Sequence, residues 1–156
     1  MSVILEGQQL EVDNLLSFRG KISQLDLNQI FMDMKNHIEG NGARCVGHPI
    51  TVTFGIFNED GENKIDIEAL VPINTIITGN SKFSFKSKLK VVNAVVVKHV
   101  GDANRLNTSC AELNQYIMDK QLVPITGGYN VTTKVEKGNI NDTEIDVYVG
   151  INPNIL

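Results

Sequence analysis

The sequence has little of what secreted and membrane proteins usually carry. It contains no tryptophan and only two cysteines, Cys45 and Cys110, which lie far apart and form no CxxC motif. This cysteine content excludes a disulfide-rich scaffold and favours a reduced, cytoplasmic protein. No apolar run reaches the roughly 18–20 residues that a membrane span needs, so we expect no membrane association. The N-terminus also lacks the basic region and long apolar core of a signal peptide.

Positive charge is scarce as well. The 156 residues include 14 Lys and Arg against 18 Asp and Glu, which gives a formal net charge of −4. Direct nucleic-acid binding is therefore not expected, because it needs clustered positive charge. Lysines at positions 82, 86, 88 and 90 follow one face of a predicted strand. Such a row is typical of a solvated face that discourages edge-to-edge pairing of strands.

Motifs of catalysis and cofactor binding are missing too. His37, His48 and His99 have no metal-ligand spacing, and Cys45 with His48 would need two further ligands to hold zinc. The sequence contains no Gly-x-Ser-x-Gly, and Gly127-Gly128 belongs to no phosphate-binding glycine loop. We therefore expect no metal site and no cofactor, and the residues alone name no catalytic chemistry.

A duplication is the strongest positive signal in the chain. Apolar residues follow the i, i+4, i+7, i+11 stripe of an amphipathic helix in 23–39 and again in 102–120. The two stripes are Leu27, Phe31, Met34, Ile38 and Leu106, Cys110, Leu113, Ile117, with members of each pair 79 positions apart. Flanking glycines and the β-rich runs that follow recur at offsets of 78 to 81. The chain therefore consists of two similar halves, at about 12–75 and 88–152.

Each half is predicted to fold as β-α-β-β. A strand (15–19; 91–100) leads to the helix, and two strands follow it (50–57 and 64–73; 129–136 and 143–151). Ser23 with Asp26 is a candidate capping pair for the first helix, and Asp102 is a candidate cap for the second. Segment 82–90 alternates as a half-buried strand does. We expect an α+β fold with pseudo-two-fold symmetry, in which one antiparallel sheet carries both helices on one face of a single domain, 1–156.

Acidic residues alternate with apolar ones in the last strand of each half. Asp66 and Glu68 share one face of the first of these strands, and Glu144, Asp146 and Tyr148 share one face of the second. If these faces point outward, they are ordinary solvated surface. If they line a cleft, a partly desolvated carboxylate there would attract a cation. The sequence leaves both alternatives open.

Several short motifs, taken in order, resemble a known family. In the second half these are Val95–Gly101, the helix with Leu106, Leu113 and Tyr116, then Gly127-Gly128 and Thr143-Glu144-Ile145. In the first half, Asp66-x-Glu68-x-x-x-Pro72 and Gly47-His48-Pro49 are similar to the family's acidic strand and its Gly-x-Pro entry. Together they resemble the GyrI-like small-molecule-binding domain, which is shared by the gyrase-inhibitory protein and the effector-binding domains of AraC- and MerR-type multidrug regulators.

The resemblance implies a protein that senses or sequesters a lipophilic, often cationic molecule in the cleft between its halves. In this family an acidic residue and aromatic rings supply charge and stacking. The matching positions in this chain are Glu68, Glu144, Tyr148, Tyr116, Phe54 and Phe18. The sequence departs from the family pattern in two ways, since it has no tryptophan and no proline in 144–150. The second departure leaves open which acidic residue corresponds to the family's acid. Residues before 12 and after 152 leave no room for a DNA-binding domain, so we expect a stand-alone form.

The same resemblance leaves two other functions open. Some stand-alone members resemble hydrolases of strained-ring xenobiotics, and Glu68 or Glu144 with Tyr148 could activate water for such a reaction. The fold also serves as a protein-binding inhibitor, so a protein partner is the second alternative. A substitution of Glu68 is expected to separate a binding protein from an enzyme and from a protein partner.

Overall fold

The computed structural model describes residues 2–135 and 143–155 and divides the chain into two compact units. We call Glu11–Leu89 the continuous unit, and Met1–Leu10 together with Lys90–Leu156 the discontinuous unit.

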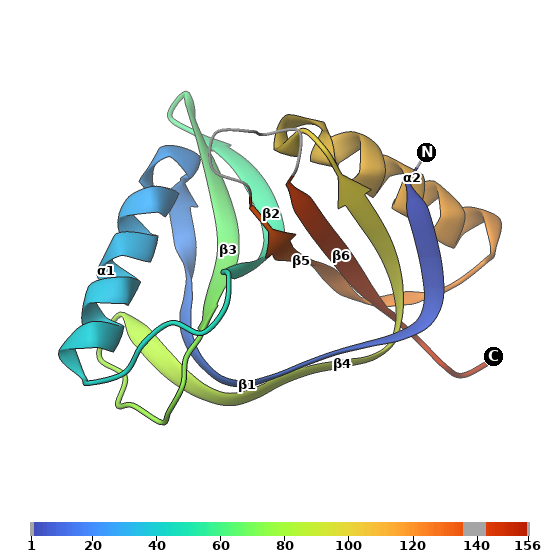
Figure 1. Cartoon of the computed structure of the whole chain (residues 1–156). Coiled ribbons are helices and arrows are strands. Elements are labelled where there is room, and N and C mark those ends of the chain that lie inside the picture. Colours follow the sequence, from blue (N-terminus) through green and yellow to red (C-terminus); the bar gives the residue numbers. More distant parts are fainter. Residues whose placement is uncertain (1, 136–142, 156) are drawn as a thin grey trace. The chain divides into compact units, whose positions relative to one another are not determined.

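The elements are β1 (Val3–Ser23), α1 (Leu27–Gly40), β2 (Ile50–Glu59), β3 (Glu62–Pro72), β4 (Phe83–Val100), α2 (Leu106–Asp119), β5 (Pro124–Lys134) and β6 (Glu144–Ile151). One-turn 3-10 helices, Gln24–Asp26 and Ala103–Arg105, precede α1 and α2. This order confirms the predicted α+β class with β-α-β-β in each half (Figure 1). The expectation of a single domain stays a prediction.

In the continuous unit, β3 is the middle strand of an antiparallel sheet. β1 pairs with β3 from Leu15 opposite Pro72 to Ser23 opposite Lys64. β2 pairs with the other edge of β3, and a bulge lies between Thr53 and Gly55. Because side chains alternate across a strand, this register sorts the residues of all three strands onto two faces.

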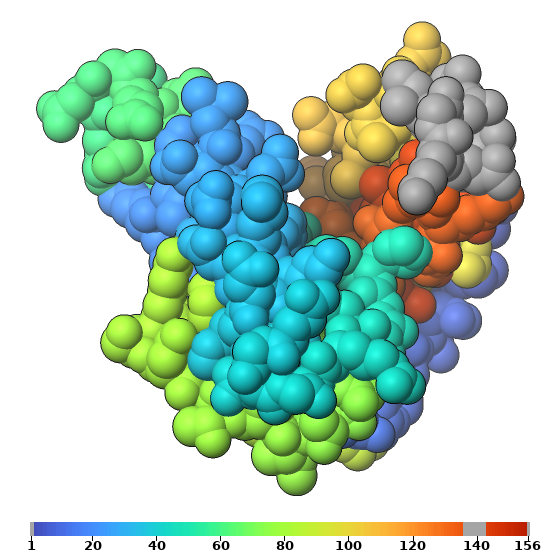
Figure 2. Space-filling model, turned by 60° about the vertical axis from the view of Figure 1, so that its left-hand side comes forward, coloured from blue at the N-terminus to red at the C-terminus, as the bar shows by residue number. Residues whose placement is uncertain are grey.

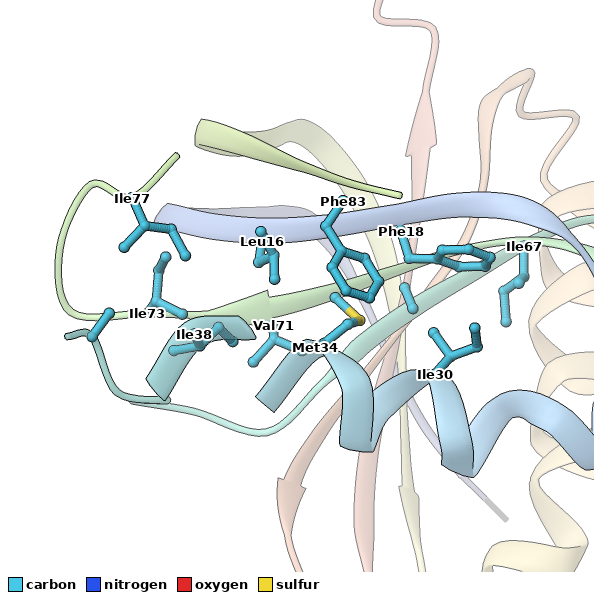
Figure 3. Packing of buried hydrophobic residues seen from close by; sticks show 12 residues of the cluster. Leu16, Phe18, Ile30, Met34, Ile38, Ile67, Val71, Ile73, Ile77 and Phe83 are labelled. Carbon is cyan, nitrogen blue, oxygen red and sulfur yellow. The ribbon is translucent and has the colours of Figure 1, made fainter. Parts of the chain in front are cut away.

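One face of this sheet packs against α1, and we call it the helix face of the unit. Its core combines residues from β1, α1, β3, the segment after β3 and the start of β4. As Figure 3 shows, these include Leu16, Phe18, Ile30, Met34, Ile38, Ile67, Val71, Ile73, Ile77 and Phe83. Met34 and Ile38 from the predicted helix stripe are fully buried, and Leu27 and Phe31 are half-buried. The predicted stripe is therefore confirmed, with Ile30 as an additional buried position.

The segment between β3 and β4 contacts α1 through two polar side chains of the helix. His37 Nε2 lies 2.9 Å from the carbonyl oxygen of Thr78, and Lys82 pairs with Asp33 at 3.1 Å. Figure 2 shows α1 (blue to cyan) with this yellow-green segment next to it. These contacts position the start of β4 in the continuous unit.

The discontinuous unit repeats the arrangement with β6 in the middle. β4 pairs with β6 from Ala94 opposite Gly150 to Val100 opposite Glu144, and β5 pairs with the other edge of β6. Its helix face packs α2 against a core of Val95, Val97, Leu113, Ile117, Ile145, Val147, Val149 and Ile151. Figure 1 shows each helix next to strands of its own unit. The described part of the chain contains no helix that is long and apolar enough to cross a membrane.

Both helices end in the same way, which extends the duplication to the backbone. Gly42 (φ 77°) and Gln121 (φ 55°) are left-handed residues that follow α1 and α2 and lie 79 positions apart. In both, the amide of the next residue donates to the carbonyl five residues back, at 3.1 and 3.0 Å. This is the hydrogen bond that characterises the Schellman motif. Asn14 (φ 57°) and Asn93 (φ 52°), in β1 and β4, show the same spacing.

Several element boundaries differ from the prediction. β1 begins at Val3 instead of 15, and β4 joins the predicted strands 82–90 and 91–100 into one. β5 begins at Pro124 instead of 129, so Gly127 and Gly128 lie inside the strand, and a Cβ on Gly128 would lie 3.2 Å from Val147. Asp102 caps the 3-10 helix that leads into α2, where its carboxylate accepts from the Asn104 amide at 2.9 Å, whereas the N-cap of α2 itself is Arg105. The Ser23–Asp26 cap is wrong, since neither makes a side-chain capping hydrogen bond in the described residues.

Candidate functional site

The face of the continuous unit's sheet that is turned away from α1, which we call its far face, carries a buried carboxylate. Glu68 on β3 pairs across the sheet with Arg19 on β1 and Val52 on β2. Its neighbours on this face include Leu15, Ile50, Val52 and Leu70, each at most 1% exposed. Glu68 itself is only 7% exposed. A carboxylate in such surroundings requires charge and hydrogen-bond partners, because desolvation of an unpaired charge is costly.

Two side chains supply those partners. The Ser17 hydroxyl donates to Glu68 Oε2 at 2.6 Å, and Lys86 Nζ lies 2.6 Å from the same oxygen. Ser17 is buried on β1, whereas the Lys86 side chain on β4 is 43% exposed. Phe83 and Phe85 belong to the core on the helix face, so alternation along β4 places Lys86 on the far face with Glu68. The carboxylate is therefore held by one buried donor and one partly solvated cation.

An aromatic ring lies on the same face beyond Glu68. Phe54 is half exposed, and the Arg19 guanidinium carbon is 4.1 Å from its ring centroid. Arg19 also forms a two-pronged ion pair with Asp66, with one of the two contacts at 3.0 Å. This geometry combines a cation–π contact with a bidentate carboxylate contact. The Phe54 face therefore already carries a protein cation.

The discontinuous unit has a related arrangement on the far face of its own sheet. Asp146 on β6 is 8% exposed, and Lys98 Nζ on β4 lies 3.4 Å from its Oδ2. Tyr148 follows on the same face, two residues along the strand. Burial, and then the charge of Asp146, raises the pKa of the Tyr148 phenol, so the phenol remains protonated at neutral pH. Each unit therefore presents a buried acid paired with a lysine from β4.

The six predicted ligand-binding residues lie in four different places. Glu68 and Phe54 share the far face of the continuous unit, and Glu144 and Tyr148 share the far face of the discontinuous unit. Phe18 instead lies in the core under α1, where its ring meets Phe83 edge-on at 6.3 Å. Tyr116 lies on α2, and its hydroxyl donates to Glu6. Contact of any of these residues with a ligand stays a prediction.

The burial of Glu68 resolves one of the open alternatives for the acidic strands. Ordinary solvated surface is the wrong interpretation for Glu68 and for Asp146, because both carboxylates are buried. Ser17 and Lys86 are absent from the predicted site residues, and Asp146 was predicted only to share a strand face with Glu144 and Tyr148. Alternation of Lys86 with Phe83 and Phe85 was a usable signal, whereas nothing in the sequence distinguishes Ser17 from other strand serines.

A serine–histidine pair in the discontinuous unit has a different character. His99 Nε2 lies 2.8 Å from the Asp102 carbonyl oxygen, which can only accept, so this nitrogen carries the proton. In the neutral ring the other nitrogen, Nδ1, then accepts from the Ser109 hydroxyl at 2.8 Å. Ser109 is 4% exposed, and Ser2 Oγ lies 2.8 Å from its oxygen. The pair is a satisfied buried polar network with a shielded serine, and it supports packing of α2 on β4. No group of three or more His, Cys, Asp or Glu among the described residues is placed to hold a metal ion.

Comparison with known proteins places the fold. No family model and no curated protein matches the chain. The crystal structure of the EcmrR C-terminal domain matches with a TM-score of 0.73 at 12% identity, covering 97% of this chain and 98% of that domain. The chain shares the fold of that domain. EcmrR in a cryo-EM complex with DNA matches with a TM-score of 0.76 at 14% identity, and the match covers 97% of this chain but only 57% of EcmrR.

A third match concerns a protein with a bound small molecule. The structure of SAV2435 bound to tetraphenylphosphonium has a TM-score of 0.57 at 7% identity, with 98% of this chain and 94% of SAV2435 covered. At these identities the matches establish the fold alone. They agree with the GyrI-like architecture that the sequence motifs predicted.

Proposed function

We propose that the chain binds a lipophilic, cationic small molecule, with Glu68 as the counter-charge. The observation that carries this proposal is the burial of the Glu68 carboxylate among apolar side chains on the far face of the continuous unit. A bulky organic cation suits both features, because it brings the positive charge that this carboxylate requires and its apolar groups favour apolar surroundings. SAV2435, which shares the fold, is bound to a ligand of this kind, tetraphenylphosphonium.

The half-exposed ring of Phe54 supplies the second recognition element. Arg19 now occupies one face of this ring, and its guanidinium is held by Asp66. A cation over an aromatic face contributes about 0.5–2 kcal/mol, which adds to the contact with the carboxylate. The expectation that the ligand lies between the two halves, with Glu144 and Tyr148 contributing, stays a prediction.

The test uses two probes of nearly the same shape and opposite charge, tetraphenylphosphonium and tetraphenylborate. Isothermal titration calorimetry is expected to show binding of the phosphonium to the wild type and at least tenfold weaker binding to Glu68→Gln. The borate is expected to bind Glu68→Gln better than the wild type, because the substitution leaves Lys86 without its counter-charge. Glu39→Gln, at an exposed position of α1, is the matched control and should change neither affinity. Equal binding of both probes to wild type and Glu68→Gln would refute the proposal.

One observation keeps the hydrolase alternative worth testing. Tyr148 lies beside Asp146, and its raised pKa keeps the phenol available as a hydrogen-bond donor or an acid. The alternative requires turnover of a strained-ring electrophile that Tyr148→Phe abolishes while tetraphenylphosphonium affinity is retained. Binding without turnover supports a sensing or sequestering protein, and a protein partner is the alternative if no small molecule binds.

A further inference from the structure

Lys86 occupies the place that a cationic ligand needs in the proposed function. We infer that Lys86 is a tethered counter-ion that a ligand must displace, so that this lysine determines which cations bind and how tightly. The inference rests on the proposed function, because it assumes that the ligand pairs with Glu68. It concerns a residue of this chain that no sequence motif singled out.

The contacts of Glu68 differ in how easily they are released. Ser17 and Lys86 both contact Oε2 at 2.6 Å, but Ser17 is 4% exposed on a central part of β1. A serine has one short rotor and keeps its hydrogen bond to the carboxylate when a ligand arrives. The Lys86 ammonium stands on a flexible four-carbon stem with 43% of the side chain exposed, so it can turn into solvent without unfolding any strand. Replacement of Lys86 by the ligand at Glu68 therefore disturbs the structure less than replacement of Ser17 would.

This arrangement selects ligands by charge. A neutral molecule that displaced Lys86 would leave a buried carboxylate without a cation, and that penalty opposes its binding. A ligand that brings its own positive charge restores the pair at the same oxygen. Arg19 and Asp66 already neutralise each other next to the site, so the charge balance at Glu68 depends on Lys86 or on its replacement.

The exchange also discriminates among cations. The released ammonium is a compact, strongly hydrated ion, so its return to water favours exchange. A primary amine ligand loses a comparable hydration when it binds and gains little from the exchange. A permanently charged, weakly hydrated cation, such as a quaternary phosphonium or ammonium with aromatic substituents, loses little hydration and adds apolar contact. The site is therefore suited to bulky delocalised cations over simple amines.

The experiment measures tetraphenylphosphonium affinity by calorimetry in three variants of the whole chain at one pH and ionic strength. Lys86→Met removes the competitor and is expected to tighten binding about tenfold, the effect of one hydrogen-bonded charge contact. Lys86→Arg keeps the charge but can bind the carboxylate with two prongs, so it should weaken binding several-fold. Lys88→Met removes the same charge two residues away, where the ammonium pairs with Glu11 at 2.9 Å, and should change affinity less than twofold.

The outcomes separate this inference from the proposed function. The order Lys86→Met, wild type, Lys86→Arg, from tightest to weakest, supports the tethered counter-ion. Binding that depends on Glu68 but is unchanged or weakened in Lys86→Met overturns the inference alone, as does equal tightening in Lys88→Met. Absence of phosphonium binding in every variant overturns the proposed function itself. Lys86→Arg, which retains a cation for Glu68, provides the test if circular dichroism shows that Lys86→Met is not folded.

Discussion

The shared ending of the two helices leads to opposite predictions for two equivalent positions. Gly42 and Gln121 both have positive φ, at 77° and 55°, but only Gly42 is a glycine. A left-handed conformation costs a residue with a Cβ about 1–2 kcal/mol, and glycine loses part of this advantage through its greater freedom in the unfolded chain. A Cβ on Gly42 would meet no atom within 4 Å, so steric contact does not enter. We therefore expect Gly42→Ala to destabilise the protein by about 1 kcal/mol and Gln121→Gly to stabilise it by a similar amount.

Differential scanning calorimetry and urea titration measure both effects. For a chain of this length, 1 kcal/mol corresponds to a change in the midpoint temperature of about 2–4 °C. Gly40→Ala is the control, because Gly40 is the last residue of α1, has no positive φ and also has open space at Cβ. It should stabilise the protein by about 0.5–1 kcal/mol, opposite in sign to Gly42→Ala only two residues away. Destabilisation by Gln121→Gly, or stabilisation by Gly42→Ala, would refute the assignment of these helix ends.

The other predictions concern packing and ionisation. Met34→Ala should lower the free energy of unfolding by about 2–5 kcal/mol in urea, since Met34 is fully buried and the truncation leaves a cavity. The hydrogen bond to Glu6 raises the pKa of Tyr116, so absorbance titration should show its ionisation above the ordinary tyrosine range, and Glu6→Gln should lower it. The stabilising effect of that hydrogen bond is present at neutral pH and is lost as pH rises through the raised pKa. Burial raises the pKa of both thiols, so at pH 8 Ellman's reagent should label Cys45 and Cys110 more slowly than a free thiol, with exposed Cys45 ahead of half-buried Cys110.

The sequence was a good guide to the fold wherever periodicity carried the information. The helix stripes depend on a period close to 3.6, and all eight predicted positions pack against the cores of their units. Ile30 is buried but was not one of the predicted stripe positions. The equivalent residue in the second helix, 79 positions later, is Ser109, which is buried with hydrogen bonds instead of apolar contacts. Polar burial of that kind has no periodic signature.

The candidate site was less predictable because it depends on contacts between strands far apart in sequence. Alternation placed Asp66 and Glu68 on one face, but the burial of Glu68 depends on Ile50, Val52 and Leu15 from two other strands. The register that brings Ser17 near Glu68 is set by the whole β1–β3 pairing. The register of β1 also decides the place of Phe18, because neighbouring residues of a strand lie on opposite faces and Phe18 lies on the core side. Its aromatic character suggested a ligand contact, whereas its register places it under α1.

The unequal composition of the two units has a consequence for the order of folding during synthesis. Glu11–Leu89 is a single stretch that contains all of its own core, so it can fold as soon as that stretch has left the ribosome. The other unit needs Met1–Leu10 together with the last 67 residues, Lys90–Leu156. Residues 1–10 therefore emerge well before the rest of their unit, and we expect a ribosome-bound state in which only the unit that contains Glu68 is formed.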